Sequence, residues 1–283
     1  MFRMISLIGL FVMASCTTIE IKEQDIFDVK RTIGPEYFKD KPQRLEEVQI
    51  ASQDSLHLEG WFISHPSAKG TVLFYGGNGF LRETAHWIIR AITEQKMNLL
   101  IFNYRGYGNN AGEPTISGLK TDAMAAYHYL VNTRNIPAER IIIHGHSMGT
   151  LLGGYIAGQQ PVGGLVMESP VTEVRYYTEQ MMPALLKPFI EFEIDSNLLN
   201  DSNIDQISRI TVPLLIVVGK EDRITPPAMA RKLYHTAASP DKRLKVLTKG
   251  GHNDLPQRKD YQNILYSFYD RAIKRSLSQG ASE

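Results

Sequence analysis

The sequence predicts an α/β fold with a mostly parallel central sheet and flanking helices. Five short apolar runs lack polar alternation, which is typical of strands buried on both faces of a sheet. Helical stretches separate these runs, and crossover connections of this kind make the strands parallel. The strands are expected at 72–75, 99–102, 141–143, 165–167 and 214–218, with helices between them at 83–95 and 116–132.

The composition agrees with one large globular domain. The chain has 283 residues, of which 43% are hydrophobic and 22% are charged, and a chain of this length buries about 75% of its unfolded surface. Its 31 basic and 30 acidic residues are interspersed and give a net charge of +1. Nucleic-acid-binding proteins usually carry a basic stripe, so the charge pattern argues against that class.

The first sixteen residues resemble a bacterial lipoprotein signal peptide. Arg3 precedes an apolar run over 4–14, and small residues precede Cys16, which is the one cysteine of the chain. The run is about half of the ~20 residues that a membrane-spanning helix needs. We expect residues 1–15 to be removed and Cys16 to be lipidated, which predicts an exported protein anchored to a membrane of the bacterial cell envelope. Cleavage after Ala14, or an uncut N-terminal anchor, is the alternative.

The remaining chain divides into a tether and one folded domain. Residues 16–46 are polar, mixed in charge and broken by glycine and proline, which is typical of a tether. Residues 47–283 form the domain, which opens with period-two alternation over 48–63 and so with an antiparallel hairpin. Residues 244–247 also alternate and are expected near a sheet edge, and an amphipathic helix at 262–274 closes the chain.

A helical lid insert is expected at about 171–210. The interval between the strands at 165–167 and 214–218 is too long for one crossover and is rich in Met, Leu, Phe and Ile side chains. These side chains either pack the insert onto the domain or line an apolar pocket beneath it, and the two roles are compatible.

The pattern Gly145-His146-Ser147-Met148-Gly149 is the strongest functional signal. It directly follows a buried strand and precedes a helix rich in small residues over 150–157. This is the context of a nucleophile elbow, where a serine occupies a tight strand-to-helix turn and glycines on either side avoid clashes. The helix N-terminus also favours developing negative charge. We therefore expect Ser147 to be a nucleophile.

A serine nucleophile needs a histidine base and an acid that orients the base. Asp222 follows the strand at 214–218, and His252 follows the last strand after two glycines. The order Ser, Asp, His along the chain is the hydrolase order. We expect Ser147 to attack a carbonyl, His252 to accept its proton and Asp222 to orient the imidazole.

Other residues compete for the roles of acid and base. Glu168 ends the strand after the elbow and is the rival acid, because some hydrolases place the acid there. His144 and His146 lie in or beside the elbow, where packing and local hydrogen bonding are the expected roles.

The oxyanion that forms during attack needs two preorganised N–H donors. Met148, directly after the serine, should supply one amide. Residues 75–80 read Tyr-Gly-Gly-Asn-Gly-Phe, and glycines permit close approach of the backbone to substrate, which favours Gly77 as the second donor. The chain has no phosphate-binding loop, H-E-x-x-H motif or paired cysteines, so neither a metal nor a nucleotide cofactor is implied.

With these motifs, the chain from about residue 47 onward resembles an α/β-hydrolase-fold serine hydrolase. Residues 103–108 (Asn-Tyr-Arg-Gly-Tyr-Gly) and 112–115 (Gly-Glu-Pro-Thr) are similar to a branch of lysophospholipases, monoacylglycerol lipases and protein depalmitoylases. The resemblance implies the roles already given to Ser147, Asp222, His252, Gly77 and Met148. The chain departs from the branch pattern at Tyr75, Asn103 and Asn110. Loop bracing is the expected role of Tyr104 and Arg105.

These residues predict a cofactor-independent hydrolase that cleaves a carboxylic ester through an acyl-enzyme intermediate. The favoured substrate is a small-molecule or lipid-like ester. Two alternatives stay open: an amidase or peptidase of the same fold, and a catalytically silent protein that binds a ligand or partner at the envelope. Because the base must be neutral, activity is expected to rise with pH near the ~6.5 of free imidazole.

Overall fold

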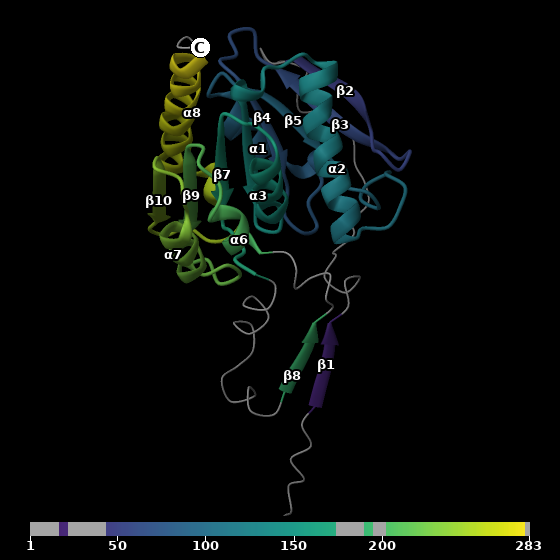
Figure 1. Cartoon of the computed structure of the whole chain (residues 1–283), viewed down its shortest axis with the longest axis vertical. Helices are drawn as coiled ribbons and strands as arrows, with labels where there is room; N and C mark the ends of the chain where they lie inside the picture. Colours follow the sequence, from purple (N-terminus) through teal and green to yellow (C-terminus); the bar gives the residue numbers. More distant parts are fainter. Residues whose placement is uncertain (1–16, 22–43, 174–189, 195–201, 281–283) are drawn as a thin grey trace, which may run out of the picture.

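An eight-stranded sheet forms the centre of the protein, with the strand order β10-β9-β7-β6-β4-β5-β3-β2 (Figure 1). The structure is a computed structural model that describes residues 17–21, 44–173, 190–194 and 202–280. Neighbouring strands from β10 to β5 pair in parallel, and β3 pairs antiparallel with both β5 and β2. The strands are β2 (Arg44–Ala51), β3 (His57–Ser64), β4 (Thr71–Tyr75), β5 (Asn98–Phe102), β6 (Ile141–His146), β7 (Gly164–Glu168), β9 (Leu214–Gly219) and β10 (Lys242–Leu247). The predicted fold class is confirmed.

The two edges of the sheet follow the alternation in the sequence. At one edge, β2 and β3 form the antiparallel hairpin that period-two alternation predicts. At the other edge lies β10, whose side chains alternate between exposed and half-buried. The apolar runs without alternation became the inner strands, where both faces are covered.

Helices cover both faces of the sheet. One apolar core contains side chains from α2 (Ile116–His128), α3 (Gly149–Gln159), α6 (Asn203–Ile207) and α7 (Pro227–Thr236), and the other contains side chains from α1 (His86–Thr93) and α8 (Lys259–Gly280). In β6, Ile141 and Ile143 belong to the first core and Ile142 to the second. Among the described helices, none is long and apolar enough to cross a lipid bilayer.

The carboxyl ends of the parallel strands carry the chemistry-bearing residues predicted from the sequence. Gly77 follows β4, Ser147 follows β6, Asp222 follows β9 and His252 follows β10. Because parallel strands present their carboxyl ends at one edge of the sheet, four segments far apart in sequence meet there.

The predicted insert at about 171–210 contains a strand where a helix was expected. Residues 190–194 form β8 (Ile190–Ile194), which pairs in parallel with β1 (Thr17–Ile21), and Figure 1 shows this pair apart from the main sheet. The sequence Ile-Glu-Phe-Glu-Ile alternates with period two, which is a strand signal that the apolar content of the insert obscured. α6 is the one described helix of the insert. The signal peptide, Cys16, and residues 22–43, 174–189 and 195–201 lie outside the described part of the chain.

A buried ion pair ties the loop after β5 to α2. Asp122 is fully buried, and its Oδ1 accepts from Arg105 Nη2 at 2.6 Å and from Ser52 Oγ at 3.0 Å. Arg105 Nε donates to Asp122 Oδ2 at 2.9 Å. Arg105 therefore braces the loop after β5 through its ion pair with Asp122 of α2, as predicted.

Asp122→Asn is expected to lower the free energy of unfolding by about 3 kcal/mol, because it leaves the buried guanidinium of Arg105 without its main counter-charge. Urea unfolding monitored by circular dichroism measures the change. Glu94→Gln is the matched control, since it removes an exposed pair with Arg90 whose side chains are 40% and 47% exposed. The control should change stability by less than about 1 kcal/mol. Equal effects for the two variants would contradict the ion-pair interpretation.

Candidate active site

Ser147 occupies a tight turn between β6 and α3. Its φ angle is +52°, a left-handed conformation that is uncommon for a residue with a side chain. The Ser147 amide donates to the carbonyl of Glu168 at 2.9 Å, and the Ser147 carbonyl accepts from Thr150 Oγ1 at 2.6 Å. These bonds hold the strained turn, which is typical of functional sites.

The flanking glycines are required by close packing around this turn. A Cβ on Gly145 would lie 2.5 Å from the carbonyl oxygen of Gly149. A Cβ on Gly149 would overlap the carbonyl oxygens of Tyr75 and Gly76 at the end of β4. The elbow geometry that the sequence pattern predicted is therefore present.

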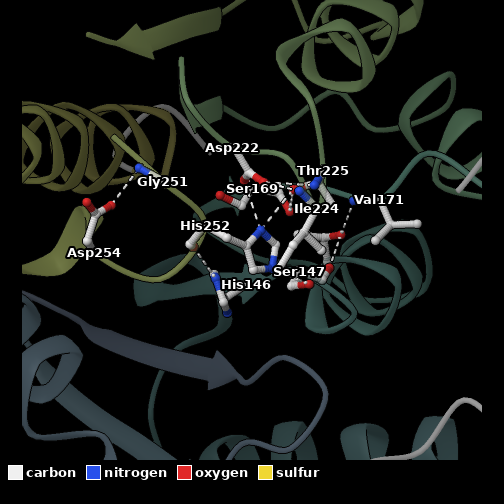
Figure 2. Close-up of polar contacts among 11 residues, drawn as sticks. His146, Ser147, Ser169, Val171, Asp222, Ile224, Thr225, Gly251, His252 and Asp254 are labelled. Carbon is white, nitrogen blue, oxygen red and sulfur yellow. Dashed lines mark hydrogen bonds and ion pairs between the residues drawn. The ribbon is translucent and has the colours of Figure 1, made fainter. Parts of the chain in front are cut away.

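His252 lies between Ser147 and Asp222, as Figure 2 shows. Its Nε2 is 2.9 Å from Ser147 Oγ, and its Nδ1 is 2.9 Å from Asp222 Oδ2. With Nδ1–H donating to the carboxylate, Nε2 is free to accept the serine hydroxyl proton. The structure thus brings together the three side chains that the sequence singled out, in the order that proton transfer requires.

Asp222 is a fixed and ionised carboxylate. It is 3% exposed, and its Oδ1 accepts the amides of Ile224 at 2.9 Å and Thr225 at 2.8 Å. Burial acts to raise the pKa of Asp222, but the hydrogen bond and charge interaction with His252 and the Thr225 amide outweigh it. The pKa of Asp222 therefore lies below its usual range, and the group is ionised at neutral pH.

Thr225 is a site residue that sequence reasoning missed. Its Oγ1 is 3.0 Å from Asp222 Oδ2, 2.9 Å from the carbonyl of Ser169 and 3.2 Å from His252 Nδ1. The hydroxyl has one proton, so it donates to either the carboxylate or the Ser169 carbonyl. The available signal was an Asp followed three residues later by Thr just before the prolines that open α7, since an Asp side chain at such a position accepts from the amides that follow it and forms a turn.

Gly77 and Met148, the two predicted oxyanion donors, both adjoin Ser147. A Cβ on Gly77 would be 3.2 Å from Ser147 Cβ, so the glycine backbone approaches the serine closely. Within the described part of the chain, neither amide donates a backbone hydrogen bond. Tyr104 O–H donates to the Gly76 carbonyl at 2.9 Å and braces this loop, as its expected role requires.

The three departures from the branch pattern have structural roles. Tyr75 is fully buried and donates to the carbonyl of Ala123 at 2.9 Å. Asn103 Oδ1 accepts the amide of Arg82 at 2.9 Å. Asn110 bridges two strand ends, because its Nδ2 donates to the Asn103 carbonyl at 2.6 Å and its Oδ1 accepts the Glu59 amide at 2.9 Å.

His146 makes a hydrogen bond to a residue far along the chain, whereas packing and local hydrogen bonding were expected for it. Its Nε2 is 3.0 Å from the backbone carbonyl oxygen of His252, and since a carbonyl only accepts, Nε2 carries a proton. Its Nδ1 points toward Gly77, where an added Cβ would be 3.0 Å away. The imidazole thus hydrogen-bonds to the backbone of the base and lies against the glycine loop.

His146→Gln is expected to weaken the pH dependence of stability in weakly acidic solution. Burial, opposed by the charge of Glu168, lowers the pKa of His146 below the 6.5 of an unperturbed histidine. As the pH falls below about 6.5, the unfolded chain binds a proton that the folded ring excludes, so stability decreases. Urea unfolding at pH 7 and pH 5.5 should show a smaller decrease in the variant, and an equal decrease in both proteins would contradict this.

Glu168 does not contact His252. Its Oε2 accepts from Tyr261 O–H at 2.5 Å and lies 3.0 Å from His144 Nε2. His144 Nδ1 in turn lies 3.1 Å from Tyr269 O–H. Of the two carboxylates considered from the sequence, the structure places Asp222 at the base and Glu168 in a separate buried network.

A known family matches the segment of the chain that contains this site. The model described as the prolyl oligopeptidase family matches residues 86–276, which contain Ser147, Asp222 and His252. The chain belongs to the prolyl oligopeptidase family. A second model, described as Chlamydia CHLPS protein (DUF818), matches residues 5–163.

Proteins of related sequence and structure match most of this chain. The protein Rv2307c of Mycobacterium tuberculosis (strain ATCC 25618 / H37Rv) is 32% identical over 237 residues, which cover 83% of this chain and 80% of the relative. The α/β hydrolase domain-containing protein WAV2 of Arabidopsis thaliana is 30% identical and covers 69% of this chain and 67% of its own. The solved esterase Pf2001 of Pyrococcus furiosus superposes with a TM-score of 0.71 at 20% identity, over 86% of this chain and 98% of its own. Family membership, WAV2 and the solved esterase agree on the α/β-hydrolase fold.

Proposed function

We propose that the protein is a serine hydrolase that cleaves a carboxylic ester through an acyl-enzyme intermediate. The observation that carries this proposal is the chain of two 2.9 Å hydrogen bonds from Ser147 through His252 to Asp222. Serine is a poor nucleophile at neutral pH, and an adjacent imidazole oriented by a carboxylate is the usual means of activating it. Membership of the prolyl oligopeptidase family supports the same chemistry.

The reaction follows from the positions of these atoms. Ser147 Oγ forms a bond to the substrate carbonyl carbon while its proton moves to His252 Nε2. The bond from that carbon to the leaving oxygen then breaks, and the proton on Nε2 goes to the leaving group. Water repeats the sequence on the acyl-enzyme, giving up a proton to His252 and releasing the acid and Ser147. The ionised Asp222 stabilises the imidazolium in both halves.

The backbone amides of Gly77 and Met148 are proposed to bind the oxyanion. Both residues adjoin Ser147, one through the close approach of Gly77 to its Cβ and the other as the next residue along the chain. Met148 also precedes the first turn of α3, where amide groups point toward the anion. Each such donor is worth about 2.7–4 kcal/mol of transition-state stabilisation in a well-studied serine hydrolase.

An amide is the second candidate substrate, because the chain belongs to a family described by an oligopeptidase activity. The triad serves ester and amide cleavage equally. Initial rates on p-nitrophenyl esters of graded chain length and on the matching p-nitroanilides separate the two. The proposal expects faster turnover of the esters, and a preference for long acyl chains would support a lipid-like ester. No turnover by folded protein would favour a silent binding protein.

We also propose that Cys16 is lipidated and anchors the domain to the bacterial cell envelope. The support is the signal-like sequence of residues 1–16 alone. The full-length protein expressed in a bacterium should fractionate with membranes, whereas Cys16→Ser should release it. A Cys16→Ser protein that stays with the membranes would overturn the lipidation proposal.

A further inference from the structure

A cavity lies on the sheet face that α1 and α8 cover. Its volume is about 240 Å³, below the ~300–1,000 Å³ of pockets for drug-sized ligands. Such a space suits one small chemical group better than a long acyl chain. His146 and Asn253 line it, and these residues adjoin Ser147 and His252 in sequence. Its wall is mainly apolar, with the aromatic side chains of Phe74, Phe80 and Trp87.

Glu168 is the charged residue of this wall. Among the described residues that line the cavity there is no Lys or Arg, and Glu168 is 1% exposed. Both hydrogen bonds of its carboxylate involve Oε2, which contacts Tyr261 and His144. Within the described part of the chain, Oε1 has no hydrogen-bond partner. A carboxylate oxygen of a cavity-lining residue that has no protein donor is available to a ligand or a water.

The surroundings of Glu168 favour its charged form. Burial acts to raise the pKa of this carboxyl, but the hydrogen bonds from His144 and Tyr261 act in the other direction, and the pKa lies below its usual range. His146 carries a proton on Nε2, which donates to a backbone carbonyl, and burial lowers the pKa of that ring, which favours its neutral form. The network can be fully hydrogen-bonded with a neutral His144, because Tyr269 O–H can donate to its Nδ1. In that arrangement the cavity carries one negative charge.

We propose that this cavity is a subsite for a small protonated amine. Glu168 Oε1 supplies the acceptor for an ammonium N–H, and the aromatic rings of Trp87, Phe80 and Phe74 supply faces that favour a cation. Because His146 and Asn253 adjoin Ser147 and His252 along the chain, an ammonium group in this cavity would belong to a substrate whose reacting carbonyl reaches Ser147. The proposed substrate class is therefore an ester or amide that bears an ammonium group, which rests on the proposed hydrolase function.

Binding can be tested without turnover, in the Ser147→Ala protein. Isothermal titration calorimetry compares benzylammonium with benzyl alcohol, two molecules of equal heavy-atom count that differ in charge. We expect benzylammonium to bind at least about tenfold more tightly, since a buried charge pair discriminates by this much or more. Glu168→Gln in the same background should reduce the preference to less than about twofold.

Thr84 provides a second pair of variants that leaves the buried network intact. This exposed residue lines the cavity, so Thr84→Lys places a competing ammonium beside Glu168 and should abolish benzylammonium binding. Thr84→Met has similar length without charge and should retain the preference. The proposal is overturned if the alcohol binds as tightly as the amine, if neither binds, or if folded Glu168→Gln and Thr84→Lys proteins both keep the preference.

The substrate prediction is tested on the wild-type protein with 4-(aminomethyl)phenyl acetate and 4-(hydroxymethyl)phenyl acetate. We expect kcat/KM to be at least about tenfold higher for the ammonium substrate. Hydrolysis of both acetates at equal rates would overturn the subsite and leave the hydrolase function standing. Selective binding of benzylammonium by a protein that hydrolyses neither these acetates nor any of the p-nitrophenyl esters and p-nitroanilides would overturn the hydrolase function and leave the subsite standing.

Discussion

Ser147→Ala is expected to lower kcat for p-nitrophenyl acetate by roughly 10⁶-fold, the loss found when the nucleophile of a serine triad is removed. The hydroxyl is the atom that bonds to the carbonyl carbon, and no other hydroxyl lies as near to His252 Nε2 among the described residues. Alanine keeps the small Cβ at the crowded elbow, so the fold should persist. Steady-state kinetics measure the loss.

Ser208→Ala is the matched control for this prediction. Ser208 is exposed at the end of α6, and its Oγ donates to the carbonyl of Asp205 at 2.8 Å. The control should keep wild-type kcat, and all three proteins should unfold at similar temperatures. A folded Ser147→Ala protein with more than one-tenth of the wild-type activity would exclude Ser147 as the nucleophile.

Asp222→Asn is expected to lower kcat by about 10⁴-fold, the size of the loss when the triad carboxylate becomes an amide. The asparagine amide would face His252 Nδ1 and favour the tautomer with the proton on Nε2, which cannot accept from Ser147. The amides of Ile224 and Thr225 still hold the side chain through Oδ1, so the loop should keep its conformation.

Glu221→Gln is the control for Asp222→Asn. It also changes a carboxylate to an amide, at an exposed residue directly beside Asp222 in the chain. Its kcat should stay within about twofold of wild type, since exposed surface charges have small effects. A loss below tenfold in folded Asp222→Asn protein would indicate that another carboxylate orients the base. Glu168 would then have to leave Tyr261 and His144 to do so.

The sheet and the principal site residues could be predicted because their signals are local. Apolar runs without alternation marked the inner strands, and glycines spaced around Ser147 marked a turn whose packing admits no Cβ. Asp222 and His252 were found because each follows a strand, and parallel strands end at the same edge of the sheet. The loop positions then bring the side chains within hydrogen-bond distance.

Contacts that depend on tertiary packing left no comparable signal. His146 touches the backbone of His252 and Glu168 meets Tyr261, across separations of 106 and 93 residues. Nothing in the pattern around either residue specifies its partner. The strand β8 was missed for a different reason, since its alternation of Ile and Glu was visible but lay in a segment whose apolar content favoured a helix.

The most direct test of the nucleophile is the site of reaction with a fluorophosphonate. In this reaction Ser147 Oγ would form a bond to phosphorus and fluoride would leave, with the serine proton taken by His252. Peptide mass spectrometry of the labelled protein should find one phosphonyl group per chain, on the peptide that contains Ser147. A label on any other residue, or no label on folded wild-type protein, would contradict the proposal that Ser147 is the activated nucleophile of a serine hydrolase.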